Sequence, residues 1–280
     1  NVLLVFLSRQ LHSSTNLLLL SLAVSDFFVG LLMFFQIMLI DGCWLLGDIM
    51  CTLYQYLSFI VTAASTGTMV LISVDRYVAI CYPLHYSTRV THKRVHICVC
   101  LCWSLSVIFS SLILMDNLKH LGRYNYCFGK CIFVLNYFAG LVDVILSFIL
   151  PLTVIVVLYM RVFTVVLSQA RAMQSRIKTD TFQKSVKVTA KKSEMKAART
   201  LGAVVVVFLI CLCPTFLIIL SGPHVSLNAS TAAFVMVLFY VNSCLNPVIY
   251  AFFYPWFRKS IKLIATLEIL KPGSHNANIL

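Results

Sequence analysis

The stretch IMCTLYQYLSFIVTAASTGTMVLISV, residues 49–74, contains no Asp, Glu, Lys or Arg. A helix needs about 20 mostly apolar residues to cross the roughly 30 Å hydrocarbon core of a bilayer, so this stretch is long enough to span a membrane. Other stretches share its character. They are residues 10–40 with Asp26 as their one charge, residues 95–115 with none, residues 131–160 with only Asp143, and residues 200–257 with none. The last has room for two crossings, because residues 221–230 between them have the composition of a turn.

These stretches predict six complete membrane-spanning helices, and the first residues of the chain indicate a seventh. Residues 1–8 are apolar and are followed by Arg9, but eight residues of helix rise only about 12 Å. We therefore expect the sequence to begin within a first helix. The predicted fold is all-α: a single seven-transmembrane helix bundle over residues 1–280, with its first helix truncated.

The composition and the placement of charge support a membrane protein. The chain is 60% hydrophobic and 11% charged, whereas soluble domains are about 45–50% apolar and about 25% charged. This excludes a water-soluble enzyme, a disordered regulator and a secreted disulfide scaffold. Of the 22 Lys and Arg residues, 19 fall in alternate connecting segments and 3 in the others. Basic segments remain in the cytoplasm, so we expect the C-terminus inside the cell.

Membrane topology and the attraction of basic segments to anionic lipid explain the net charge of +13. A nucleic-acid partner is not needed to explain it. A third intracellular segment is expected at about residues 161–196, including cytoplasmic helix extensions, and its lysines suit a cytoplasmic partner. We expect a short amphipathic eighth helix at about residues 254–264 and a C-terminal tail at residues 265–280.

Asp26 lies in the middle of a span, where ionisable residues are costly and usually functional. Other polar residues occur at similar depth in other predicted helices; they are Ser65, Asn242, Ser243 and Asn246. Together with Asp26, their oxygens are suited to a sodium ion. The alternative is a hydrogen-bonded core that holds no ion.

Asp143 lies eight residues before Pro151, toward the extracellular side of its predicted helix. A buried carboxylate is costly to keep charged unless a cation or strong donors lie nearby, and no predicted span contains Lys or Arg. An ammonium ligand would supply that charge, and Ser147, four residues on, shares the face of Asp143. The alternative is a structural Asp143 that contacts another helix or water.

Aromatic side chains at comparable depth would complete a site for a cation, since ring faces attract ammonium groups. They are Tyr54, Phe59, Phe148, Phe216 and Tyr240. Ordinary packing explains any single ring equally well.

Four cysteines, Cys43, Cys51, Cys127 and Cys131, are expected outside the cell, where disulfides persist. A bridge from the loop that carries Cys127 and Cys131 to Cys51 would hold a lid over the pocket. The remaining cysteines fit as small apolar side chains in or near the spans. Asn228-Ala229-Ser230 forms a glycosylation sequon.

Two motifs resemble the signatures of rhodopsin-like G-protein-coupled receptors. They are Asp75-Arg76-Tyr77 at the inner end of the third span and Asn246-Pro247-Val248-Ile249-Tyr250 in the last. Other positions that fit this family are Trp103, Pro151, Tyr159, Phe208, Cys211 and Pro214. Within the family, NSCLNP at residues 242–247 and FFYPWFRK at residues 252–259 resemble the trace amine-associated receptors. The resemblance implies a Cys51–Cys131 disulfide and a partner for Cys127 upstream of this sequence.

Two departures from the family pattern bear on function. Aminergic receptors usually hold the ligand ammonium with a third-helix aspartate, and the corresponding position here is Ser58. Asp143 lies on the fifth helix instead. Its position resembles that of the inverted amine site in a subset of fish trace amine receptors. Leu212 stands where the family usually has tryptophan, so coupling would run through Phe208 and Phe216.

The resemblance implies a receptor for small amines with two sets of functional residues. The ligand residues are Asp143, Ser147, Ser58, Tyr54, Phe59, Thr62, Phe148, Thr215, Phe216 and Tyr240. The residues for activation and G-protein coupling are Asp75, Arg76, Tyr77, Glu194, Tyr159, Phe208, Pro214, Asn246, Pro247 and Tyr250. At rest Arg76 is expected to pair with Asp75 and Glu194.

The expected partners are an amine, a heterotrimeric G protein of the stimulatory type acting through cyclic AMP, and membrane lipid. The expected location is the plasma membrane, with olfactory cilia as a candidate. Apart from the sodium ion no cofactor is expected, and no constellation of residues suggests catalysis. Two alternatives remain: a receptor for a non-amine odorant or peptide with a structural Asp143, and a truncated product that does not signal.

Overall fold

The computed structural model describes residues 14–40, 44–120, 131, 135–177, 202, 205–221, 229–253, 262 and 266. The long helices in this part of the chain are α2 (Ser14–Ile40), α3 (Gly47–Cys81), α5 (His92–Ile113), α8 (Leu150–Ile177) and α10 (Ala229–Phe253). Shorter segments are η2 (Pro83–His85), α4 (Tyr86–Arg89), α6 (Met115–Lys119), α7 (Tyr137–Asp143) and η3 (Val144–Ile149). A further apolar helix covers Val205–Ser221.

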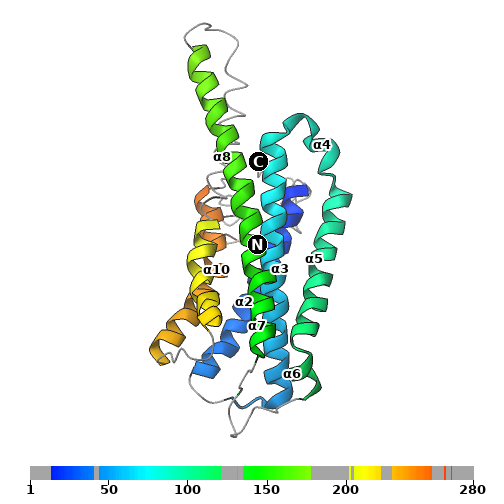
Figure 1. The fold of residues 1–280 in the computed structure, drawn as a ribbon, viewed down its shortest axis with the longest axis vertical. Coiled ribbons are helices and arrows are strands. Elements are labelled where there is room, and N and C mark those ends of the chain that lie inside the picture. The colour runs from blue at the N-terminus through cyan, green and yellow to red at the C-terminus, as the bar shows by residue number, and fades with distance from the viewer. Residues whose placement is uncertain are drawn as a thin grey trace.

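The long helices lie side by side along the long axis of the molecule, so the fold is a helical bundle (Figure 1). Helix α3 is central, because it packs against α2, α5 and α8. Four helical stretches are long and apolar enough to cross a membrane: Ser14–Ile37, Gly47–Cys81, His92–Ile113 and Tyr137–Ser168. The shorter apolar helices Val205–Ser221 and Ala233–Asn246 match the two crossings predicted within residues 200–257. The helical transmembrane bundle is confirmed.

Several predictions fall outside the described residues. They concern the first-helix stub at residues 1–8, the amphipathic helix at about residues 254–264 apart from isolated positions, the tail at residues 265–280 and most of the third intracellular segment. Cys43, Cys127, Glu194 and the sequon at Asn228 also lie outside this part, while α8 extends to Ile177 at the start of the third intracellular segment.

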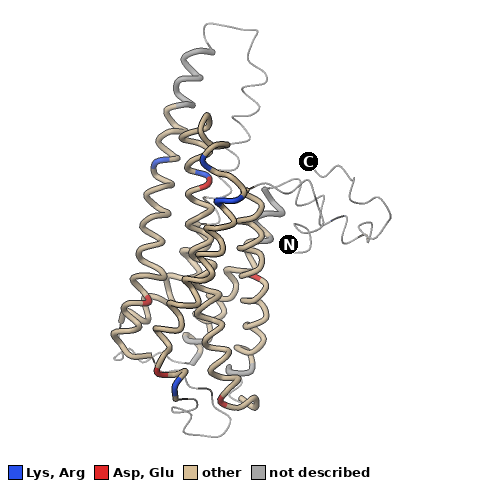
Figure 2. The backbone as a smooth tube through the Cα atoms, turned by 90° about the vertical axis from the view of Figure 1, so that its right-hand side faces the viewer, with Lys and Arg blue, Asp and Glu red and all other residues tan. Residues whose placement is uncertain are grey.

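The two ends of the bundle differ in charge. Most of the described Lys and Arg residues lie near the upper end, where α4 is found in Figure 1, and few lie near the lower end (Figure 2). This distribution agrees with the predicted orientation, in which the upper end faces the cytoplasm.

The helix that carries Asp143 widens within the bundle. Pro151 has no N–H to donate to the carbonyl group four residues earlier, and the turn before it is a π-helical segment, η3, between α7 and α8. Within it the N–H of Leu150 donates to the carbonyl oxygen of Ile145, five residues back. Such wide turns are frequent at functional sites, and this one begins directly after Asp143.

Candidate ligand-binding site

A cavity of about 890 Å³ lies among α2, α3, α7, η3, the Val205–Ser221 helix and α10. Its volume is in the range of small-molecule sites. Every predicted ligand residue except Phe148 lines it: Tyr54, Ser58, Phe59, Thr62, Asp143, Ser147, Thr215, Phe216 and Tyr240. Sequence reasoning missed other lining residues, among them Gln36, Gln55, Val235, Met236 and Phe239.

Asp143 ends α7 and contributes the acidic group of the cavity. The residue is 8% exposed, and the Ser147 hydroxyl donates a hydrogen bond of 2.9 Å to Asp143 Oδ1. The predicted partnership between these residues is therefore present. Among the described residues, no Lys, Arg or His forms an ion pair with Asp143. The carboxylate thus faces the cavity with a neutral donor beside it and capacity for a cation.

Phe148 forms part of the packing behind the cavity. Its ring stacks on the Phe216 ring with centroids 4.3 Å apart, which joins η3 to the Val205–Ser221 helix. Leu212 and Phe208 are buried in the same hydrophobic cluster, and Tyr159 packs against it. A ligand that contacts Phe216 is therefore connected to the hydrophobic core through the Phe148–Phe216 stack.

A second set of polar side chains, Gln36, Tyr54 and Tyr240, lies on α2, α3 and α10. The Tyr54 hydroxyl donates to Gln36 Oε1 at 2.5 Å, and the hydroxyl oxygens of Tyr54 and Tyr240 are 2.7 Å apart. Ser58, in the position where aminergic receptors usually have aspartate, lies beside both tyrosines and lines the same cavity. The hydroxyl groups of the two tyrosines are thus joined in a neutral network, and the cation-binding role of their ring faces stays a prediction.

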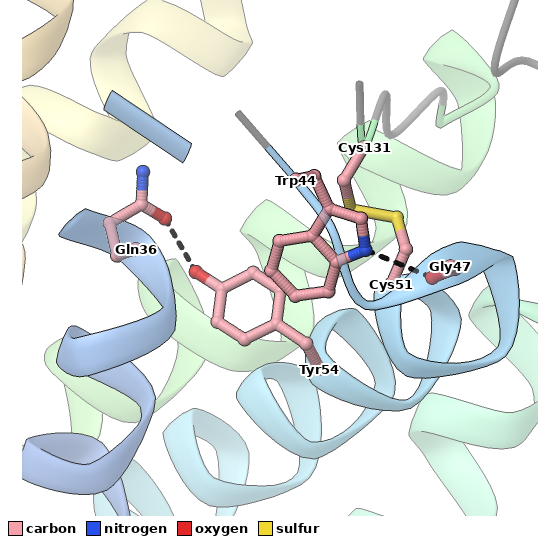
Figure 3. The surroundings of a disulfide bond; sticks show 6 residues. All are labelled: Gln36, Trp44, Gly47, Cys51, Tyr54 and Cys131. Carbon is pink, nitrogen blue, oxygen red and sulfur yellow. Dashed lines mark hydrogen bonds between the residues drawn. A yellow bond between two sulfur atoms is a disulfide. The ribbon is translucent and has the colours of Figure 1, made fainter. Parts of the chain in front are cut away.

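A disulfide lies close to this network. It links Cys51 at the start of α3 to Cys131, as the family resemblance implied, with Cα atoms 5.6 Å apart. Figure 3 shows Trp44 between the disulfide and Tyr54, with its indole N–H donating to the Gly47 carbonyl at 2.9 Å. Gly47 has a φ of 76°, which favours glycine. The disulfide therefore fixes Cys131 at the cavity wall.

Thr215 supplies an unused polar group to the cavity. Its hydroxyl oxygen is buried and has no hydrogen-bond partner among the described residues. A buried hydroxyl without a partner is unfavourable, so Thr215 contributes an unsatisfied polar group beside the cavity.

A separate polar cluster surrounds Asp26 in the middle of the bundle. The Asn246 side-chain amide donates to both Asp26 carboxylate oxygens at 3.2 and 3.1 Å, and Ser243 lies beside Asp26. Ser65 and Asn242 are buried, and the Asn242 side-chain oxygen has no hydrogen-bond partner in the described part of the chain. The side chains of Pro247 and Tyr250 are not among those described.

The Asp75-Arg76-Tyr77 motif forms a third cluster at the end of the bundle that is predicted to face the cytoplasm. Arg76 and Asp75 form the predicted ion pair at 2.6 Å. Two partners were not predicted: Thr15 of α2 donates to Asp75 at 3.1 Å, and the Tyr86 hydroxyl of α4 donates at 2.8 Å. Burial raises the pKa of Tyr86, so its phenol remains a donor at neutral pH. Glu194, the other predicted partner of Arg76, lies outside the described residues.

Comparison with known proteins identifies the family. Residues 2–250 match the model of the 7 transmembrane receptor (rhodopsin family). The chain is 36% identical to trace amine-associated receptor 13c of Danio rerio over 280 residues, which cover 97% of this chain and 82% of that protein. Trace amine-associated receptor 4 of Mus musculus is 33% identical, with 97% of this chain and 81% of that protein covered. The chain is thus a multi-pass membrane receptor, not an enzyme, and it belongs to the rhodopsin family as a receptor of the trace amine-associated type.

Proposed function

We propose that this receptor binds small amines and that Asp143 holds the ligand ammonium group. The observation that carries the proposal is the buried Asp143 carboxylate at the cavity wall, where Ser147 donates to it and no cationic side chain among the described residues pairs with it. An ammonium group would supply the missing charge, and a buried charge needs such a partner. The names of the two relatives described above, both trace amine-associated receptors, support the same ligand class.

The proposal extends to signalling. Ligand binding shifts a receptor toward its active state only when the active state binds the ligand more tightly. We assign the resting state to the Asp75–Arg76 cluster and the transmission to Phe148, Phe216 and Phe208. Release of Arg76 would open the cytoplasmic face to a heterotrimeric G protein, with cyclic AMP as the output. The plasma membrane is the proposed location, with olfactory cilia as a candidate.

We also propose that the Asp26 cluster holds a sodium ion. Asp26, Ser65, Asn242 and Asn246 are buried, and the unpartnered Asn242 oxygen is a free ligand for a cation. Asn246 would supply its side-chain oxygen. Because the ion would neutralise a buried carboxylate, it would stabilise the receptor conformation that contains it.

The amine site is tested with Asp143→Asn, which keeps the shape of the side chain and removes its charge. Cells that express wild type or variant receive a panel of mono- and diamines, and cyclic AMP is measured at matched surface expression. Removal of one partner from a buried ion pair costs about 3–5 kcal/mol, so the effective concentration should rise more than about hundredfold. Ser147→Ala, which removes only one neutral hydrogen bond, should cause a much smaller shift.

A full amine response in Asp143→Asn would refute the assignment. A neutral analogue that activates the wild type as well as its amine would favour the alternative receptor for a non-amine ligand. Absence of any response, with the receptor at the surface and G proteins of several classes present, would favour the non-signalling product.

A further inference from the structure

The neutral network of Gln36, Tyr54 and Tyr240 has unused hydrogen-bonding capacity that faces the cavity. Tyr54 gives its single proton to Gln36 Oε1. The Tyr240 hydroxyl oxygen lies 2.7 Å from the Tyr54 oxygen and 3.5 Å from Gln36 Oε1, so Tyr240 shares its proton between these two acceptors. The Gln36 side-chain amide retains two N–H donors, and among the described residues no hydrogen bond to them is present. In Figure 3 the Gln36 nitrogen points away from Tyr54.

This capacity has a defined chemical character. The free N–H groups of Gln36 need an acceptor, and the Tyr240 oxygen retains a lone pair that suits a donor. Gln36, Tyr54, Tyr240 and Ser58 carry no charge, so a second ammonium or a carboxylate would lose its hydration here without a counter-charge. An ether, carbonyl or hydroxyl oxygen matches the network. Because these residues and Asp143 line the same cavity, one molecule can contact both groups.

We propose that Gln36, Tyr54 and Tyr240 form a second subsite that selects amines bearing an uncharged oxygen acceptor. The proposal rests on the proposed amine site, since Asp143 would hold the other end of the same ligand. It adds a role for the hydroxyl groups of Tyr54 and Tyr240, while the cation-binding role expected for their rings stays a prediction. It also gives a physical role to Ser58: a serine in place of the usual aspartate keeps this part of the cavity neutral.

The test uses matched pairs of ligands. Each ω-methoxyalkylamine with three to eight methylene groups is compared with the n-alkylamine that has the same number of non-hydrogen atoms. Dissociation constants come from ligand-induced thermal stabilisation of the purified receptor in lipid nanodiscs. In the wild type, at least one methoxy member should bind more tightly than its alkyl partner by about fivefold, the ratio expected for one net hydrogen bond.

Gln36→Leu should remove this preference and leave the affinity for the alkylamine unchanged. Tyr56→Phe is the control, because Tyr56 is not among the residues that line the cavity and its hydroxyl contacts Ser111 instead, and this variant should keep the preference. Tyr240→Phe is a second arm in case Gln36→Leu does not fold, and it should reduce the preference. A purely structural network would instead lower the stability of the unliganded receptor and weaken both ligands of a pair equally.

Ser58→Asp provides a gain-of-function arm. An added carboxylate beside Tyr54 and Tyr240 should abolish the methoxy preference and tighten the binding of an α,ω-diaminoalkane by more than about tenfold. Equal binding of the paired ligands by wild type, or an unchanged preference in Gln36→Leu and Tyr240→Phe, would overturn the subsite. Alkylamine binding that is insensitive to Asp143→Asn would instead overturn the amine site, so the two failures are distinct.

Discussion

Three buried aspartates of this receptor differ in the partners that offset their charge. Asp75 has the guanidinium group of Arg76 at 2.6 Å. Asp26 has the amide of Asn246, and Asp143 has the hydroxyl of Ser147. Neutral donors offset a buried charge only in part. Asp26 and Asp143 are therefore the positions at which an external cation has most to contribute.

The sodium proposal predicts a measurable stabilisation that depends on Asp26. At a sodium concentration about ten times the dissociation constant, binding to the folded receptor adds about 1.4 kcal/mol. The melting temperature of the purified receptor should rise when sodium chloride replaces choline chloride, and Asp26→Asn should remove this rise. Asp48→Asn is the control, since it changes the same charge at an exposed position in the first turn of α3 and should keep the sodium response.

At the scale of elements, the contact between α3 and α5 depends on a residue without a side chain. A Cβ atom added to Gly67 of α3 would lie 2.5 Å from the Cys102 sulfur of α5. Gly67→Ala should therefore destabilise the receptor by about 1–3 kcal/mol, the usual cost of overpacking. In the double variant with Cys102→Ala the clash disappears. A thermal double-mutant cycle should give a coupling of at least about 1 kcal/mol.

Gly30→Ala in α2 is the control for this cycle. Apart from its chain neighbours and the backbone of its own helix, no atom of the described structure lies within 4 Å of a Cβ atom built at Gly30, so the better helix propensity of alanine should leave stability equal or higher. Additive effects of Gly67→Ala and Cys102→Ala would show that the two helices do not depend on this contact.

The helices were predictable from sequence because long stretches without charge have few alternatives to a membrane span. The residues of the second subsite were only partly predictable. Tyr54 and Tyr240 attract attention as aromatic residues, but their hydroxyl partnership depends on the register of α3 against α10. Gln36 gives no signal in the sequence, because an amide near the outer end of a membrane helix is common and uncharged. Only the packing of α2 against α3 and α10 brings it to them.

At the scale of the whole molecule, the ligand cavity and the Asp75–Arg76 cluster lie at opposite ends of α3. The 21 residues from Tyr54 to Asp75 correspond to about 30 Å of helix. A buried hydrophobic cluster extends between them and includes Phe216, Leu212 and Met69. The hydrogen-bond partners of Asp75 also come from separate parts of the chain, since Thr15 belongs to α2 and Tyr86 to α4. No local sequence pattern predicts that Thr15 and Tyr86 both contact Asp75.

This arrangement predicts that a weaker cytoplasmic cluster raises signalling without ligand. Tyr86→Phe removes the hydrogen bond of 2.8 Å to Asp75. Loss of about 1 kcal/mol from the resting state alone should raise the active population, and with it basal cyclic AMP per surface receptor, by about fivefold. Tyr56→Phe is the matched control, because it also removes a phenol contact of 2.8 Å, here with Ser111 at the other end of α3 from Asp75. Basal activity should rise in Tyr86→Phe only. An equal rise in both variants would point to a general loosening of the bundle, and no rise in Tyr86→Phe would show that Asp75 holds the resting state without the help of α4.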